Sequence, residues 1–292
     1  MTMAETNHPG ERMSVIVLTH NRARELMRTL EMMVALPEKP NLVVVDNASH
    51  DNTAEQVRRY YPHVHVVSLD RNVGAAARNL GVQQVFTPYV AFCDDDTWWE
   101  SGSLARATEL LDAYPNVAVL SARILVGEDE RLDPVCAAMA NSPLESGRLP
   151  GKALFGFMAG ASVFRREAFL KAGGYEPALF LGGEEGLLAI DLAARGWAMV
   201  YAPQLTVHHH PSPNRDARTR RKLLARNAIW VACLRLRWPT VLSASYRALL
   251  EAMRGGVFFA TLFDTVPGIP WTLRNRRVVP ASVDAMYRKT RL

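Results

Sequence analysis

From Met13 onward, short apolar runs rich in β-branched residues alternate with amphipathic segments. The apolar runs occupy residues 14–18, 41–45, 64–67, 89–93 and 117–120. The amphipathic segments, which predict helices, occupy residues 24–35, 53–60, 74–86 and 103–114. Because strands that are apolar at nearly every position are buried on both faces, the pattern predicts a parallel sheet covered by helices. We therefore expect a Rossmann-like α/β unit that extends to about residue 121.

The pattern becomes irregular over residues 122–156, where Pro134, Pro143 and Pro150 stand among several Gly and Ser residues. We expect a long irregular connection there, suited to a flap over an active site. Regular structure resumes at residues 157–164, with predicted helices over 166–172 and 184–194, a turn at 173–174 and a strand over 198–201. A long basic amphipathic helix is predicted over residues 218–238.

The net charge of +5 conceals an asymmetry along the 292 residues. Residues 1–211 carry 18 Lys and Arg against 25 Asp and Glu, whereas residues 212–292 carry 16 against 4. With 49% hydrophobic residues the composition is that of a globular protein rather than a disordered chain. We expect a disordered segment 1–12, an acidic α/β domain 13–211 and a basic helical C-terminal region 212–292.

The cysteines and the N-terminal segment favour a cytoplasmic protein. The three cysteines, which are widely spaced and form no CxxC pair, support neither a disulfide framework nor a cysteine zinc site. Residues 1–12 are polar and include Glu5 and Glu11, unlike a secretory signal. The apolar stretch 255–263 is about half of the roughly 20 residues that a membrane-spanning helix needs.

Three consecutive carboxylates, Asp94, Asp95 and Asp96, follow the apolar run 89–93. Because such carboxylates repel one another, a hard cation such as Mg²⁺ or Mn²⁺ is an efficient way to hold them together. Asp94 and Asp96 with a bound diphosphate would complete its coordination, at the sheet edge where α/β proteins bind ligands. The alternative is a solvated acidic turn in which an Asp or Thr97 caps a helix.

Polar side chains also follow the first two predicted strands. Their segments are Thr19-His-Asn-Arg22 and Asp46-Asn-Ala-Ser49. Asp and Asn can read a base or a ribose there, although each can equally form a helix cap or an Asx turn. The later segment Asp70–Asn79 places a Gly and three Ala at a helix start, where a backbone can approach an anion or pack closely on a sheet.

The ordered set of these segments resembles family-2 glycosyltransferases of the GT-A fold over residues 13–210, which implies a Rossmann-like fold whose mixed central sheet is flanked by helices. The matching segments are Ser14-Val-Ile-Val-Leu-Thr-His-Asn-Arg22, Val43-Val-Val-Asp-Asn-Ala-Ser49, Arg71-Asn-Val-Gly-Ala-Ala-Ala-Arg-Asn79 and Asp94-Asp-Asp96. The resemblance implies a nucleotide-diphosphate sugar donor, a Mn²⁺ or Mg²⁺ cofactor and inversion at the anomeric carbon. It also implies a nucleotide-binding half, 13–121, and an acceptor half, 122–211. The implied donor-binding residues are Thr19, Asn21, Arg22, Asp46, Asn72, Gly74, Arg78, Asp94 and Asp95.

The same resemblance implies a downstream acidic pair and a metal-binding histidine. Aligning the chain on Gly196 and Pro203 makes Glu185 the general base and His209 the metal ligand beside Asp94 and Asp96. A shift of one residue would give these roles to Glu184 and His208. Many relatives carry a further acid two residues after the base and a basic residue four beyond that, where this chain has Leu187 and Asp191.

The aromatic pair Trp98 and Trp99 can line an acceptor cleft or belong to the core. The basic region beyond residue 211 has the composition of a helix that lies on an anionic membrane surface. Alternatively, Leu223, Ile229 and Trp230 pack on the α/β domain. Arg274 to Arg277 suit a phosphate of a polyprenyl-linked acceptor, and no nucleic-acid-binding module is recognisable.

We therefore predict a metal-dependent inverting hexosyl- or deoxyhexosyltransferase of cell-envelope polysaccharide or glycolipid synthesis. Its acceptor would be a saccharide or a lipid-linked sugar, and the basic region would bring it to the inner face of the membrane. One alternative is a sugar-1-phosphate nucleotidyltransferase, which would need a Gly-rich basic loop that residues 19–24 do not supply. The other is a non-catalytic module that binds sugar nucleotides or lipid surfaces.

Overall fold

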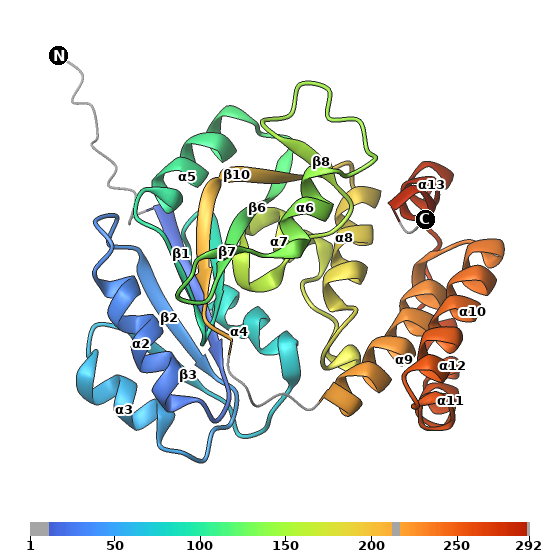
Figure 1. Cartoon of the computed structure of the whole chain (residues 1–292), viewed down its shortest axis with the longest axis horizontal. Helices are drawn as coiled ribbons and strands as arrows, with labels where there is room; N and C mark the ends of the chain where they lie inside the picture. The colour runs from blue at the N-terminus through green and yellow to red at the C-terminus, as the bar shows by residue number, and fades with distance from the viewer. Residues whose placement is uncertain (1–11, 212–216, 291–292) are drawn as a thin grey trace.

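The computed structural model describes residues 12–211 and 217–290 (Figure 1). The predicted disorder of residues 1–12 falls, apart from Arg12, outside this part of the chain. The strands are β1 Met13–Thr19, β2 Asn41–Asp46, β3 His65–Ser68, β4 Tyr89–Asp94, β5 Thr97–Trp99, β6 Val117–Val126, β7 Arg131–Leu132, β8 Lys152–Leu154, β9 Ser162–Arg165 and β10 Ala198–His209.

The strands form one mixed sheet in the order β3-β2-β1-β4-β9-β6-β10-β5, with β7 beside β6 and β8 beside β10. The strands β3, β2, β1 and β4 are parallel, and β9 runs antiparallel to both of its neighbours, β4 and β6. Val15, Ile16 and Val17 of β1 are fully buried, as the continuous apolar pattern predicts. The carboxyl ends of β1, β2 and β4 therefore meet at one edge of the sheet.

Helices flank this sheet along the whole α/β domain. They are α2 Ala23–Val34, α3 Thr53–Tyr60, η1 Gly74–Ala76, α4 Ala77–Gln83, α5 Ser103–Ala113, α6 Pro134–Ala140, η2 Ala159–Ala161, α7 Arg166–Ala172, η3 Pro177–Leu179 and α8 Glu184–Ala194. The C-terminal region adds α9 Ala217–Arg235, α10 Trp238–Arg254, α11 Phe258–Thr265, η4 Val266–Gly268, α12 Ile269–Arg274 and α13 Ala281–Thr290. Figure 1 shows these C-terminal helices beside α8, at the opposite end of the molecule from α2 and α3.

Two predictions are wrong in detail, namely the irregular connection over residues 122–156 and the single helix over residues 218–238, and a proline explains each difference. The connection 122–156 is not irregular throughout, because Pro134 starts α6 after Asp133, whose side chain accepts a hydrogen bond from the Val135 N–H at 2.9 Å. The helix predicted over 218–238 is interrupted after Arg235, and Pro239 lies in the first turn of the next helix, α10. Proline favours helix starts as much as it disfavours helix interiors.

The strand predicted over 198–201 continues to His209, past an irregularity between Ala202 and Thr206 in its pairing with β6. Pro203 falls in this irregular stretch, where a missing backbone N–H is tolerated. The extension carries the histidines along the sheet to the strand β5, and so to the aspartates that precede it.

Helix α9 packs its apolar residues on α8 and on the segment before it. Ile229 and Trp230 of α9 belong to a buried cluster with Leu179, Leu187 and Ile190. The apolar face of α9 thus packs partly on the α/β domain and partly on the other C-terminal helices, where the Trp230 indole N–H donates to the Thr265 carbonyl at 3.0 Å. No helix in residues 12–211 and 217–290 is long and apolar enough to cross a membrane.

Candidate active site

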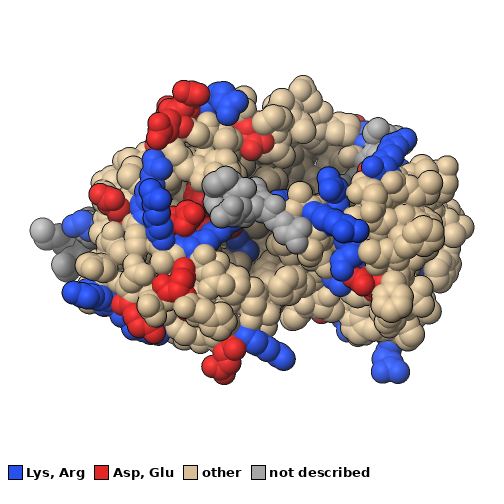
Figure 2. All heavy atoms as spheres, turned by 60° about the horizontal axis from the view of Figure 1, so that its bottom comes forward, with Lys and Arg blue, Asp and Glu red and all other residues tan. Residues whose placement is uncertain are grey.

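The candidate site lies at the sheet edge where β1, β2 and β4 end. Thr19, Asp46 and Asp94 are the last residues of these three strands. Figure 2 looks toward this face and shows a hollow between the α/β domain and the C-terminal helices, with acidic and basic side chains along its walls. The sheet thus brings together residues that the sequence separates by more than 70 positions.

The three aspartates divide into a buried pair and an outer carboxylate. Asp95 and Asp96 are 6% and 4% exposed, and Arg22 Nη1 lies 3.0 Å from Asp95 Oδ1 and 3.1 Å from Asp96 Oδ2. Asp94, whose side chain is 43% exposed, forms an ion pair with the buried guanidinium of Arg78. Arg22 and Arg78 thus offset much of the repulsion within the run.

Asp95 and Thr19 are turned toward each other beneath the surface. Thr19 Oγ1 donates to Asp95 Oδ2 at 3.0 Å, and Thr19 is only 1% exposed. Burial raises the pKa of Asp95 to about 7, although the charge of Arg22 opposes that shift. Both residues are predicted to contact the donor, and that contact stays a prediction; in the structure they bind each other, and Asp95 also binds Arg22.

His208 and His209 of the histidine triplet contact different residues. His209 Nε2 lies 3.6 Å from Asp96 Oδ1. His208 Nδ1 lies 3.4 Å from Glu130 Oε1, and its ring stacks on Trp98 with the ring centroids 5.7 Å apart. Because neighbouring residues of a strand point to opposite faces, His209, not its neighbour, faces the aspartates. Trp98 and Trp99 are buried, as core residues would be.

The side chains at this sheet edge include suitable ligands for a divalent cation, but too few to complete its coordination. Among the residues the structure describes, no group of three or more His, Cys, Asp and Glu side chains is arranged to hold a metal ion. Asp96 and His209 offer one carboxylate and one imidazole, which are common ligands of divalent metals. Asp94 is nearby in sequence but is paired with Arg78. The remaining ligands would have to come from a bound diphosphate.

The loops after β1, β2 and β3 are joined by side-chain amides. Asn47 Nδ2 donates to Asn72 Oδ1 at 2.9 Å and to the Gly74 carbonyl at 3.1 Å. Asp46 Oδ1 accepts from the Ser49 N–H at 3.0 Å, and Asn21 Oδ1 accepts from the His50 N–H at 2.7 Å. The network fixes three of the predicted donor-binding residues, Asn21, Asp46 and Asn72, relative to one another. Asn47, which the sequence analysis did not select, is central to it.

The acidic pair opens helix α8 on the other side of the site. Glu185 Oε1 accepts a hydrogen bond from the Ala159 N–H at 2.6 Å. Burial raises the pKa of the Glu185 carboxyl to about 7, and the charge of Glu184 acts in the same direction. Burial also raises the pKa of Glu184, whose Oε2 has no hydrogen-bond partner among the described residues. Both carboxylates are thus held in a partly desolvated place.

The comparison with known proteins decides the family. The family described as Glycosyl transferase family 2 matches residues 14–173, more than half of the chain. The chain belongs to this family. A curated relative is the N-acetylglucosaminyl-diphospho-decaprenol L-rhamnosyltransferase of Mycobacterium tuberculosis, 23% identical over 234 residues, which cover 67% of this chain and 75% of the relative.

Solved structures of glycosyltransferases share the fold of this family-2 glycosyltransferase. A mannosyltransferase of Pyrobaculum calidifontis, in complex with GDP-Man and Mn²⁺, is 20% identical and has a TM-score of 0.56, with 96% of this chain and 86% of that chain covered. TarS 1–349 of S. aureus in complex with UDP is 17% identical and has a TM-score of 0.56, with 95% and 91% covered. The predicted GT-A fold with C-terminal helices is confirmed.

A short turn of this family-2 glycosyltransferase links the aspartates to the acidic pair, and sequence reasoning missed it. It is η2, whose Ala159 N–H binds Glu185. A Cβ atom added to Gly160 would lie 2.5 Å from Asp94 Oδ2, and the Gly160 carbonyl accepts from Thr97 Oγ1 at 3.3 Å. The signal in the sequence is a run of small residues, which permits this close approach.

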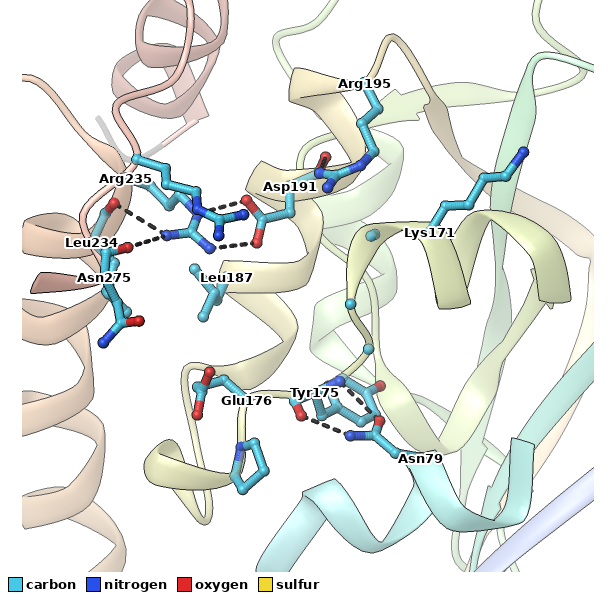
Figure 3. A pocket seen from close by; sticks show the side chains of 15 residues that line it. Asn79, Lys171, Tyr175, Glu176, Leu187, Asp191, Arg195, Leu234, Arg235 and Asn275 are labelled. Atoms are coloured by element: carbon cyan, nitrogen blue, oxygen red, sulfur yellow. Dashed lines mark hydrogen bonds and ion pairs between the residues drawn. The ribbon is translucent and has the colours of Figure 1, made fainter. Parts of the chain in front are cut away.

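The two departures from the family pattern face the C-terminal helices. Leu187 is 5% exposed within the apolar cluster shared with α9. Asp191 forms a two-bond ion pair with Arg235 of α9, with Nε–Oδ1 at 2.6 Å and Nη2–Oδ2 at 3.0 Å (Figure 3). A cavity of about 560 Å³ lies between these elements, lined also by Asn79 and Tyr175. The altered residues of this family-2 glycosyltransferase are thus contacts to α9.

Proposed function

We propose that this glycosyltransferase moves a sugar from a nucleotide-diphosphate sugar to an acceptor hydroxyl with inversion at the anomeric carbon. The observation that carries the proposal is the place of Glu185, a half-buried carboxyl whose pKa desolvation raises to about 7, across η2 from the aspartates. A general base is most effective when its pKa is near the working pH. Membership of family 2 also favours sugar transfer over nucleotidyl transfer.

In this proposal Glu185 accepts the proton of the acceptor hydroxyl as its oxygen attacks the anomeric carbon. Attack occurs on the face opposite the leaving group, so one displacement inverts the configuration. The Ala159 N–H holds one carboxylate oxygen of Glu185, which leaves the other, Oε2, to take the proton. Glu184 lies beside the base and, through its charge, keeps the pKa of Glu185 high enough for proton transfer at neutral pH.

The donor would lie over the loops that Asn21, Asp46 and Asn72 fix, with its diphosphate near Asp94 and Arg78. Asp96 and His209 would hold Mn²⁺ or Mg²⁺, supported by their separation of 3.6 Å and by the ligand chemistry of both groups. When bound there, such a cation would supply charge stabilisation to the departing diphosphate. The solved mannosyltransferase in complex with GDP-Man and Mn²⁺ supports this assignment by analogy of fold.

The pH dependence of transfer tests the proposed base. In the wild-type enzyme, kcat/KM for the donor should fall about tenfold per pH unit below a pH near 7, because Glu185 must be ionised. Glu184→Gln removes the neighbouring negative charge, so the pKa of Glu185 and the fall in rate should both move to lower pH. Acceptor-dependent release of nucleoside diphosphate with Mn²⁺ measures this rate.

In the same assay the rate of Glu184→Gln at pH 8.5 should stay within about fivefold of the wild type, since Glu185 is ionised in both enzymes there. A pH profile that is identical in the two enzymes would contradict the coupling of the two carboxylates. A wild-type enzyme that transfers no sugar from UDP-, GDP- or dTDP-linked donors would contradict the proposed function itself.

We also propose that the acceptor is lipid-linked and that the C-terminal helices contact the membrane surface. The mycobacterial relative is a rhamnosyltransferase named for an N-acetylglucosaminyl-diphospho-decaprenol acceptor, which is lipid-linked. Figure 2 shows the end of the molecule formed by these helices as a broad surface with few charged side chains. Exposed large apolar side chains on α10 and α11 include Leu242, Tyr246, Met253, Phe259 and Phe263, a set here called the apolar end.

Cations accompany the apolar end, which is the combination that anionic bilayers attract. Arg254 is in the last turn of α10, and Arg274 is in the last turn of α12. Phe259 and Phe263 are 83% and 81% exposed and lie one turn apart on α11. Apolar side chains at such positions can enter the headgroup region while the arginines contact anionic lipids.

Substitution of both phenylalanines should release the protein from vesicles. Phe259→Ser with Phe263→Ser should weaken co-sedimentation with phosphatidylglycerol-containing vesicles by more than about tenfold, because each buried Phe contributes about 1.5–3 kcal/mol. Phe86→Ser is the matched control, since Phe86 is 89% exposed but follows α4 in the α/β domain. Absence of wild-type binding to these vesicles would contradict the membrane contact.

A further inference from the structure

Asn227 of α9 is fully buried, and its side chain binds the backbone that leads to the acidic pair. Its Nδ2 donates to the carbonyl oxygens of Leu179 at 2.8 Å, Leu181 at 3.1 Å and Gly182. Its neighbour Arg226 donates from Nη2 to the Leu179 carbonyl at 3.0 Å. One buried amide thus binds three carbonyl groups of a segment that lies 45 or more residues earlier in the chain.

That segment, residues 179–183, holds a strained conformation. Phe180 has φ +63° and ψ −66°, the geometry of a γ-turn that non-glycine residues rarely adopt, and the Leu181 N–H donates to the Leu179 carbonyl at 2.8 Å. Gly182 and Gly183 follow with φ of +82° and +91°. Such a conformation persists only where surrounding contacts impose it. The amide of Asn227 is such a contact.

The segment is confined from two sides. A Cβ atom added to Gly182 would lie 2.7 Å from Leu224 Cδ2, and one added to Gly183 would lie 2.9 Å from Asn227 Cβ. On the donor side the Ala75 N–H donates to the Phe180 carbonyl at 2.7 Å, and a Cβ atom at Gly74 would overlap that carbonyl oxygen. Helix α9 therefore presses the segment against the donor loop at Gly74.

Helix α8 begins where this segment ends, and α9 also holds its far end. Glu184 directly follows Gly183, so the position of the acidic pair depends on where the segment lies. Two turns further along α8, Asp191 binds Arg235 of α9 through two hydrogen bonds (Figure 3). The base-bearing helix is thus attached to α9 at both ends, through Asn227 and through Arg235.

We propose that Asn227 is a positioning residue for the proposed sugar transfer, one that sets the place of Glu185 relative to the donor loop. The inference rests on the proposed role of Glu185. The amide of Asn227 touches neither the donor loops nor the acidic pair, and acts through the carbonyls of Leu179, Leu181 and Gly182. A displacement of about 1 Å in a catalytic group can reduce the rate about 100-fold.

Two substitutions of opposite character test the proposal. Asn227→Asp keeps the shape of the side chain but replaces the donating amide with carboxylate oxygens that face three carbonyl groups. Asn227→Ser removes volume but keeps one O–H donor. At pH 8.5 we expect kcat to fall about 100-fold in Asn227→Asp and less than about tenfold in Asn227→Ser. If Asn227 served only to fill space, the serine variant would be the more impaired, and the proposal would be overturned.

Calorimetric titration with the nucleoside diphosphate and Mn²⁺ shows whether a loss of kcat comes from a displaced Glu185 or from a smaller fraction of folded enzyme. The stoichiometry of binding should stay near one, with the dissociation constant within about threefold of the wild type, because the substitution alters no residue of the donor loops and the Phe180 carbonyl that binds the Ala75 N–H is not a partner of Asn227. Cys233→Ala is the control, since Cys233 is buried further along the same helix in the apolar cluster. It should lower the melting temperature without lowering kcat.

A parallel measurement on Glu185→Gln separates this inference from the function on which it rests. If Glu185→Gln lacks transfer while Asn227→Asp keeps wild-type kcat, the positioning role is wrong and the base assignment stands. If Glu185→Gln keeps wild-type turnover, the base assignment is wrong, and a loss in Asn227→Asp would reflect another group on α8. The proposal is supported if Asn227→Asp lowers kcat but leaves the KM values unchanged, and if Glu185→Gln is inactive.

Discussion

Glu185→Gln should lower kcat by about 10²–10⁴-fold while nucleotide binding changes by less than about threefold. The amide of glutamine cannot accept a proton at neutral pH, so the attacking hydroxyl would have no base. The substitution nearly preserves shape, and the glutamine carbonyl can still accept the Ala159 N–H that Glu185 Oε1 accepts. Initial rates at saturating donor and acceptor measure the effect, and calorimetry measures binding.

Glu184→Gln is the matched control for that substitution, because it removes a neighbouring carboxylate from the same helix turn. If Glu185 is the base, Glu184→Gln keeps most of its activity at alkaline pH. The reverse result, an inactive Glu184→Gln beside an active Glu185→Gln, would transfer the role to Glu184. Equal turnover in both variants and the wild type would leave neither carboxylate as the base.

Asp96→Asn should weaken Mn²⁺-dependent binding of the nucleoside diphosphate by more than about tenfold. Asp96 is the carboxylate that faces His209, and an amide is a much poorer ligand for a hard divalent cation. The ion pair between Arg22 and Asp95 remains in the variant, so the fold around the site should hold. Titrations with and without Mn²⁺ give both dissociation constants.

Asp112→Asn provides the comparison for this effect. Asp112 is also paired with an arginine, Arg12, but it is on α5 and its side chain is 42% exposed. Its substitution should leave the metal dependence of binding unchanged. Nucleotide binding by the wild type that is equally tight with and without Mn²⁺ would contradict the assignment of Asp96 and His209.

Much of the α/β domain could be predicted because its signals are local. The strands β1, β2 and β4 are short apolar runs with polar residues directly after them, so both the elements and the sheet edge follow from the pattern. The ordered motifs carried the family, which the comparison confirmed. The location of the aspartates and of the loops after β1 and β2 at one sheet edge could be predicted for the same reason, since each lies where a strand ends.

The remainder depends on contacts between distant segments. Gly160 and Ala159 bridge two parts of the site, but a run of small residues has many other uses in proteins. Asn227 lies within a basic helix whose composition predicts an exposed surface. Nothing near it in the sequence shows that its amide is buried against residues 179–182. The buried hydrogen bond between Thr19 and Asp95 could not be predicted either, because a sequence shows proximity to a strand end but not which way a side chain turns.

The contact between α8 and α9 gives a signature for choosing among related chains. Asn227 and Arg235 are eight residues apart on α9; Asn227 lies against the segment whose Gly182 and Gly183 leave room for α9, and Arg235 binds Asp191. A relative that keeps one side of this pairing should keep the other, since an unpaired buried amide or carboxylate is costly. If these positions change together among related sequences, the catalytic domain and its C-terminal helices have evolved as one unit.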